Sequence, residues 1–109
     1  MVSDTFTSLK RLVASGDVRI SEHGYEELAN DDLTAREIVN GIDKAILVED
    51  YPNYPKRASV LVLQTDSHGQ PVHVVWGIPK GHTRPAVLVT AYRPDPSRWN
   101  TEFKRRKDE

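Results

Sequence analysis

The sequence predicts an α+β fold in which short N-terminal helices pack on a four-stranded antiparallel meander sheet. Before Ala45, apolar residues recur at spacings of three and four, which is the helical period. After Ala45 the pattern changes to short runs rich in Val and aromatic residues, separated by turns that contain Pro and Gly. Consecutive strands with short connections usually pair as neighbours, and helices this short are stable only when docked.

Three helices are expected in the first part of the chain. The first spans about residues 4–15 and stops at Gly16. Ser21 is a good N-cap for a second helix that runs to about Ala29. The third begins at a full capping box, Thr34-Ala35-Arg36-Glu37, in which the Thr and Glu side chains each cap a backbone N–H group.

Four strands are expected to follow, and residues 18–20 are expected to be only a brief extended link. The expected strands are residues 45–50, 59–65, 72–78 and 86–92. Alternate side chains of a strand point to opposite faces, so each strand offers one apolar set to the helices. The set expected to be buried is Val60, Val62, Val74, Trp76, Val87 and Val89, unless the opposite parity faces inward.

The last two strands carry the polar residues most indicative of function. His73 interrupts the first of them, and Thr90 and Tyr92 lie at the end of the second. The alternation puts His73 on the face opposite Val72 and Val74. We therefore expect the function of the protein to reside on this hairpin.

A length of 109 residues predicts a single domain spanning residues 1–109. Its core is expected over about residues 4–99, Trp99 is expected to fold back onto it, and the basic tail of residues 100–109 is expected to be frayed. There is no cysteine, which excludes disulfides and thiolate metal sites. No apolar run could span a membrane, so we expect a soluble cytoplasmic protein without a membrane partner.

Charge is distributed unevenly along the chain. Residues 1–55 carry 5 Lys or Arg and 11 Asp or Glu, whereas residues 56–109 carry 10 and 5. A basic second half is typical of a protein that meets a polyanion or an acidic partner. The alternative is that the two halves face each other or that the basic tail is merely solvated.

The ordered set of motifs resembles a known family over about residues 18–99. The motifs are Ser21-Glu22-His23, Val48-Glu49-Asp50-Tyr51-Pro52, Pro71-Val72-His73-Val74-Val75 and Val89-Thr90-Ala91-Tyr92-Arg93-Pro94, followed by Trp99. This set resembles the small bacterial family called domain of unknown function 4258. That resemblance implies membership of the assemblage of RelE-, barnase- and colicin-like ribonucleases, whose helices precede a four-stranded antiparallel sheet.

The resemblance implies a metal-independent endoribonuclease of the toxin type, with RNA and an antitoxin as partners. His23, His73 and Tyr92 are the positions it marks as catalytic, and Thr90 as a substrate contact. In such a reaction the 2′-hydroxyl attacks the adjacent phosphate while a base and an acid move protons. Two imidazoles can share that work because His titrates near neutral pH. The cations available to hold phosphate are Lys56, Arg57, Lys80, Arg84 and Arg93, expected to cluster near His73 and Tyr92.

Three further expectations follow. If the sheet curls toward the second helix, His23, His73 and Tyr92 line one cleft. Replacing either His with Ala then removes cleavage and leaves the fold intact. Because the four His lack HxH and HExxH spacing, no metal is expected, and because no Walker or dinucleotide-type Gly pattern is present, no cofactor is expected.

Other interpretations remain open at the level of sequence. His73 can be a satisfied sheet residue, His23 can simply shape a helical turn, and Tyr92 can close a sheet edge. His68 and His82 are expected to be solvated in turns. The alternative function is a non-catalytic module of the same fold that binds a protein partner.

Overall fold

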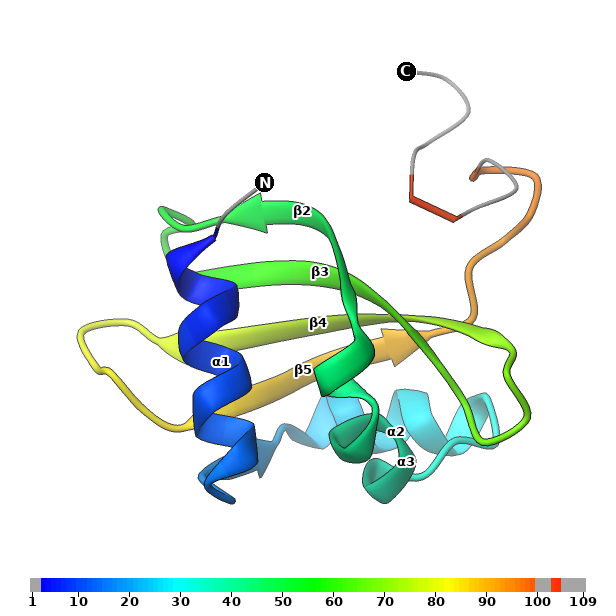
Figure 1. Cartoon of the computed structure of the whole chain (residues 1–109), viewed down its shortest axis with the longest axis horizontal. Coiled ribbons are helices and arrows are strands. Elements are labelled where there is room, and N and C mark those ends of the chain that lie inside the picture. Colours follow the sequence, from blue (N-terminus) through cyan, green and yellow to red (C-terminus); the bar gives the residue numbers. More distant parts are fainter. Residues whose placement is uncertain (1–2, 100–102, 105–109) are drawn as a thin grey trace.

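The computed structural model describes residues 3–99 and 103–104, and it confirms the α+β class. Figure 1 shows that the strands form a single sheet and that the helices pack against it. In chain order the elements are α1 (Asp4–Ala14), β1 (Val18–Ile20), α2 (Glu22–Asn30), α3 (Ala35–Asn40), the 3-10 helix η1 (Ile42–Lys44), β2 (Ile46–Tyr51), β3 (Arg57–Thr65), β4 (Pro71–Pro79) and β5 (Ala86–Tyr92). The three helices and the four later strands lie close to their expected positions.

The sheet has five strands, which corrects the expectation of four. The order is β1-β5-β4-β3-β2, with antiparallel pairing from β2 to β5 and parallel pairing between β1 and β5. The expected link of residues 18–20 is therefore a strand, with Val18 opposite Ala86. Its partner lies far along the chain, so no local pattern could identify the pairing.

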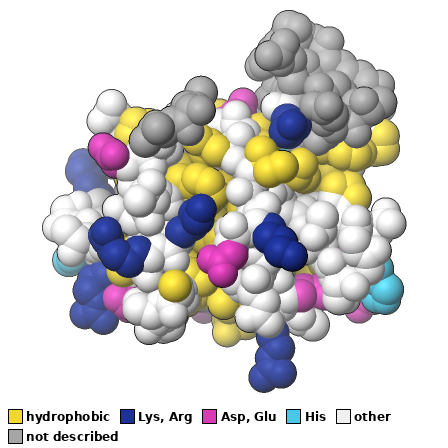
Figure 2. Space-filling model, viewed as in Figure 1, with side chains coloured by type: hydrophobic (Ala, Val, Ile, Leu, Met, Phe, Trp, Pro, Cys, Tyr) yellow, Lys and Arg dark blue, Asp and Glu magenta, His cyan; other side chains and the backbone are white. Residues whose placement is uncertain are grey.

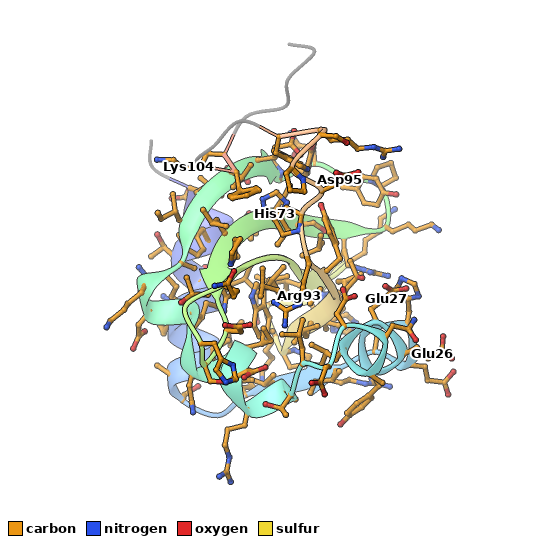
Figure 3. All side chains as sticks on the ribbon, turned by 90° about the vertical axis from the view of Figure 1, so that its right-hand side faces the viewer. Glu26, Glu27, His73, Arg93, Asp95 and Lys104 are labelled. Atoms are coloured by element: carbon orange, nitrogen blue, oxygen red, sulfur yellow. The ribbon has the colours of Figure 1, made fainter. Side chains whose placement is uncertain are left out.

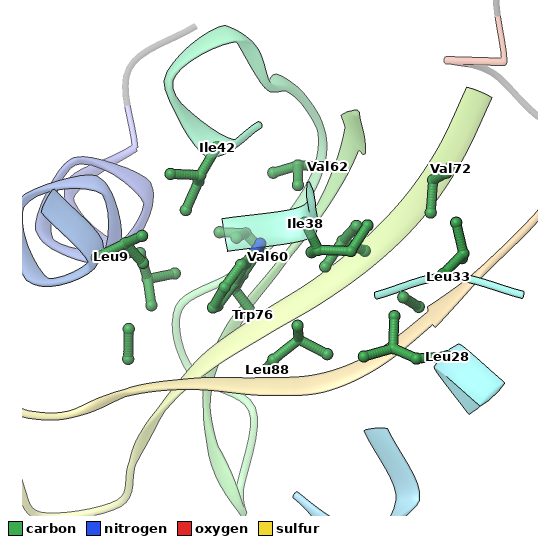
Figure 4. Close-up of a cluster of buried hydrophobic side chains, with 14 residues drawn as sticks. Leu9, Leu28, Leu33, Ile38, Ile42, Val60, Val62, Val72, Trp76 and Leu88 are labelled. Atoms are coloured by element: carbon green, nitrogen blue, oxygen red, sulfur yellow. The ribbon is translucent and has the colours of Figure 1, made fainter. Parts of the chain in front are cut away.

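The core lies between the sheet and the helices that cover one of its faces. Helix α1 crosses the strands on this face, and α2 packs against β5 near the β1 edge (Figure 1). Figure 4 shows the interior, where side chains from all three helices and the loop after α2 meet those of β3, β4 and β5. The fully buried members from the sheet are Val60, Val62, Val72, Val74, Trp76, Ala86, Leu88 and Ala91.

Burial confirms four of the six expected core residues of the sheet and corrects two. Val87 and Val89 are only half-buried, and Leu88 is fully buried in their place. The cause is a β-bulge in β5, because Val75 pairs with Thr90 while the next residue, Trp76, pairs with Leu88. The extra residue, Val89, resets the alternation of side chains along the strand.

The bulge also anchors the start of α2. The Ser21 hydroxyl accepts a hydrogen bond from the Gly24 N–H at 2.9 Å and donates one to the Val89 carbonyl at 2.9 Å. Gly24 lets the helix approach closely, since a Cβ there would lie 2.9 Å from the Leu88 carbonyl oxygen. Ser21 thus caps the helix, as expected, and also ties it to β5.

A buried polar link joins α3 to the centre of the sheet. Gln64 is 2 % exposed, and its amide donates to the Ile38 carbonyl at 2.7 Å. Its side-chain oxygen accepts from the Trp76 indole N–H at 3.0 Å. The largest core side chain therefore has its one polar atom satisfied, as burial requires.

Candidate functional site

The candidate site occupies the sheet face opposite α1, which we call the outer face. The strand registers assign to it Glu49 and Tyr51 of β2, Ser59, Leu61 and Leu63 of β3, His73 and Val75 of β4, and Thr90 and Tyr92 of β5. Its two ends differ. The segment that follows β5 covers one end, and the turn between β2 and β3 borders the other.

His73 lies at the covered end and is fully buried. Its Nε2 lies 2.6 Å from the Phe103 carbonyl oxygen, and its Nδ1 lies 3.4 Å from the Tyr92 hydroxyl. The Trp99 ring packs edge-on against the imidazole, with 4.3 Å between ring centroids. Figure 3 views the molecule from this end and shows His73 lying beneath the C-terminal segment. Trp99 folds back onto the domain, as expected, and is 4 % exposed.

These contacts assign a tautomer to His73. A carbonyl oxygen can only accept, so Nε2 carries the proton that is donated to Phe103. In the neutral ring Nδ1 is then an acceptor, which suits the hydroxyl of Tyr92. The structure brings together the two residues expected to be catalytic on the sheet, but in a buried cluster where His73 presents no surface to a substrate.

His23 lies apart from this cluster, in the first turn of α2. Its side chain is 62 % exposed, and its Nε2 lies 3.7 Å from a carboxylate oxygen of Glu27 on the next turn. Since His73 is fully buried, the two imidazoles do not line a common cleft, which corrects the expectation that they would. Glu26 and Glu27 also make the α2 surface beside His23 acidic (Figure 3), which disfavours a phosphate there.

Two of the five candidate cations hold the fold together. Arg93 donates to Asp66 at 2.9 Å and to the Asp31 carbonyl at 3.3 Å, which links the β3–β4 turn to the end of α2. The Arg84 guanidinium donates twice to the Asp17 carboxylate, at 2.5 and 3.1 Å. The hydrogen bond from Arg84 lowers the pKa of Asp17. Burial of the carboxylate opposes this effect, and the positive charge of Arg84 adds to it.

The exposed end of the outer face contains a hollow of about 300 Å³. Its floor is formed by Ser59, Val75 and Val89, and its walls by Tyr51, Tyr54, Lys56 and Arg57. Tyr51 and Tyr54 are 45 % and 52 % exposed, which is unusual for such large side chains. We call the four wall residues the Tyr-Lys-Arg patch.

Gly77 determines how Arg57 lies in this patch. A Cβ at Gly77 would come within 2.7 Å of Arg57 Cδ and 3.1 Å of its Cγ. The aliphatic part of Arg57 therefore runs across β4 at a position that lacks a side chain. In the part of the chain that the structure describes, neither Lys56 nor Arg57 forms an ion pair, so both charges are available to a ligand.

Four of the five candidate cations lie away from His73 and Tyr92, which corrects the expectation of one cluster, and only Arg93 among the five lines a hollow with Tyr92. Arg57 lies opposite Pro79, and about 20 Å of strand separates Pro79 from His73 at 3.3 Å per residue. On the helix-covered face, basic side chains alternate with acidic ones (Figure 2). Lys56 and Arg57 are thus at the end away from His73, whereas Arg98 lines a separate hollow with Tyr92 and Trp99 at the covered end.

Sequence reasoning did not select Tyr51 and Tyr54 as site residues. The signal was present in Tyr51-Pro52-Asn53-Tyr54-Pro55-Lys56-Arg57, where two aromatic residues and two cations share one proline-rich turn. Thr90, expected as a substrate contact, lies beside the hollow, since it pairs with Val75 of the floor. Lys80 lines a neighbouring hollow together with Arg57.

The described residues provide neither a metal-binding cluster nor a membrane-spanning helix. Among residues 3–99 and 103–104, no group of three or more His, Asp or Glu side chains could hold a metal ion. No helix in the same ranges is long and apolar enough to cross a membrane. Most of the tail expected to be frayed, residues 100–109, lies outside the described residues; the exceptions are Phe103 and Lys104.

Comparison with known proteins places the chain in one family. The profile described as Domain of unknown function (DUF4258) matches residues 20–93, which include β5, α2 and most of the outer face. No curated protein and no solved structure matches the sequence significantly. The chain therefore belongs to the DUF4258 family.

Proposed function

We propose that this protein binds RNA on its outer face, through the Tyr-Lys-Arg patch. The observation that carries the proposal is that Lys56 and Arg57, which form no ion pair with the residues that the structure describes, surround one hollow together with the exposed ring of Tyr54. Cations bind the phosphate backbone, and aromatic rings provide platforms for unpaired bases.

The distribution of charge restricts where the backbone of the RNA can lie. Arg84 and Arg93 are already engaged with Asp17 and Asp66, so they offer less to phosphate. Helix α2 contributes Glu22, Glu26 and Glu27 and would repel a polyanion. A bound strand is therefore expected to follow the β2–β3 side of the face.

A second candidate function is metal-independent cleavage of the bound RNA, as in RelE- and barnase-like ribonucleases. The observation that favours it is the contact between an imidazole and a phenol, His73 and Tyr92, on the same face. In that reaction one group takes the 2′-hydroxyl proton and another protonates the leaving 5′-oxygen. A substrate oxygen can reach Nε2 of His73 only in place of the Phe103 carbonyl.

The two functions are separated by one set of assays on purified protein with labelled RNA. RNA binding predicts retention that weakens steeply as salt is added, because phosphate contacts release counterions. Cleavage predicts products with a 2′,3′-cyclic phosphate that form equally well with a chelator present. Lys56→Ala and Arg57→Ala should weaken binding, whereas Arg11→Ala, an exposed control on α1, should not.

Absence of salt-dependent RNA binding would refute the proposal and leave the non-catalytic protein-binding module. Binding without cleavage would retain the first function and remove the second. Cleavage that stops on addition of chelator would show that the metal-free route is wrong.

A further inference from the structure

A second hollow adjoins the first at the end of the sheet. It has a volume of about 410 Å³ and lies between the β2–β3 turn and the β4–β5 loop. Tyr54 and Arg57 line both hollows. Lys56 lines only the first, and Lys80 and His82 line only the second.

The two hollows are similar in size and in the types of residue that line them. Sites for small ligands usually have volumes of about 300–1,000 Å³, so each hollow is at the lower end of that range and suits one nucleotide unit. Each has its own lysine, and Lys56 and Lys80 are both exposed. Arg57 stands between them with its stem laid across Gly77.

We infer that the two hollows hold consecutive nucleotides of a single-stranded RNA, with the phosphate that joins them on Arg57. The inference rests on the proposed function and specifies its substrate class and minimal length. Arg can bind a phosphate through two parallel N–H bonds, which suits the position shared by both units. Lys56 and Lys80 then contact the flanking phosphates, and the Tyr54 ring is available to a base from either side.

A duplex does not meet these requirements. Its bases are stacked on one another and paired, so they cannot place a ring face on Tyr54. Single-stranded RNA has unstacked bases and a flexible backbone that can bend from one hollow to the next. The geometry therefore favours single strands over paired RNA.

The test measures the affinity of the full chain for oligouridylates of one to six nucleotides and for a 12-base-pair RNA duplex. Affinity should rise by about tenfold from the mononucleotide to the dinucleotide, because a second base gains a binding position. The duplex should bind more weakly than a 12-nucleotide single strand. Lys56→Ala and Lys80→Ala should each lower the affinity for the tetranucleotide, which carries both flanking phosphates, by about threefold, whereas the exposed control Lys44→Ala, in η1, should leave it unchanged.

The outcomes distinguish this inference from the proposed function. If the 12-nucleotide strand binds but Lys80→Ala changes nothing, the second hollow is not used and the inference is overturned while RNA binding stands. Equal affinity for mononucleotide and dinucleotide, or tighter binding of the duplex, would overturn it in the same way. If no RNA binds at any length, both proposals fail.

Discussion

The two ends of the outer face contain polar residues in opposite situations. At the covered end, the two ring nitrogens of His73 are engaged by Phe103 and Tyr92. At the exposed end, Lys56 and Arg57 border a hollow without an ion pair among the described residues. Side chains at the covered end stabilise the fold, whereas those at the exposed end remain available for binding.

The contrast shows why residue type alone is a weak guide to function. A histidine in a strand is the more conspicuous residue in a sequence, yet His73 is fully buried. Lysine and arginine in a turn attract little notice, yet here they accompany two exposed tyrosines. Whether a polar group is already satisfied within the fold decides what it can offer to a partner.

The largest expected effect is at the covered end, on replacement of His73 with Ala. The change removes a buried ring and leaves the Phe103 carbonyl without its donor, so we expect a loss of about 2–4 kcal/mol of stability. Urea denaturation measures it, with His82→Ala as the exposed control, expected to lie within about 0.5 kcal/mol of wild type. The sequence alone suggested that His73→Ala would leave the fold intact, but because His73 is buried we now expect this variant to lose stability. A stability equal to that of wild type would show that His73 is not part of the packed structure.

The second effect is at the exposed end, on the double change Lys56→Ala and Arg57→Ala. Two phosphate contacts are lost, so the slope of log affinity against log salt should fall by about 1.4 for single-stranded RNA. Binding at several salt concentrations measures it, and a urea denaturation curve monitors stability, because Lys56 is exposed but Arg57 is half-buried with its stem packed across Gly77. The matched control is Arg11→Ala with Lys44→Ala on the helix-covered side. An equal loss in the control would mean that binding depends on net charge alone.

A smaller effect is expected from Gly77→Ala, which tests whether the position of Arg57 matters. The new Cβ would lie 2.7 Å from Arg57 Cδ and would displace its stem. We expect RNA affinity to fall by about two- to fivefold. This is a smaller loss than for Arg57→Ala, because Gly77→Ala moves the guanidinium group but does not remove its charge. Competition binding measures the change, and a thermal melt monitors the fold. Unchanged affinity would indicate that Arg57 binds equally well from several positions.

The smallest effect concerns pH and the Asp66 carboxylate at the covered end. The hydrogen bond from the Gln70 N–H is the largest of the effects that lower the pKa of Asp66. Burial opposes it, and the hydrogen bonds from the His68 N–H and from Arg93, together with the charge of Arg93, lower the pKa further. A pKa lowered on folding contributes stability above its usual value of 3.8, and this is lost as pH falls through the folded value. Urea midpoints between pH 6 and pH 2.5 should therefore fall less for Asp66→Asn than for wild type. If the urea midpoints of wild type and Asp66→Asn fell in parallel with pH, protonation of Asp66 would not contribute to the pH dependence of stability.

The helices and later strands were predictable because their signals are local. The capping box of Thr34 and Glu37 is formed in the structure, with hydrogen bonds of 3.1 and 3.3 Å. Ser21 caps α2 as expected, and the change of period after Ala45 marks where the sheet begins. Each of these features depends on residues within one or two turns of each other.

The candidate site was predicted only in part, for a related reason. The sequence singled out His73, Tyr92 and Thr90 on the outer face, as well as Lys56, Arg57 and Lys80 around the hollows. It could not show that the first of these is buried, because the covering residues Trp99 and Phe103 lie 26 and 30 positions further along the chain. It missed Tyr51 and Tyr54 because the exposure of a side chain depends on what packs over it.

The sequence by itself determined the order of the three helices and the four later strands, the caps and the family, since those follow from the spacing of neighbouring residues. Only the tertiary structure decided that β1 joins β5, that Val89 forms a bulge and that Leu88 rather than Val87 is buried. It also decided that the two ends of the outer face differ. The physical reason is that strand pairing, burial and satisfaction of polar groups depend on contacts between residues far apart in the chain. No pattern within one segment encodes those contacts.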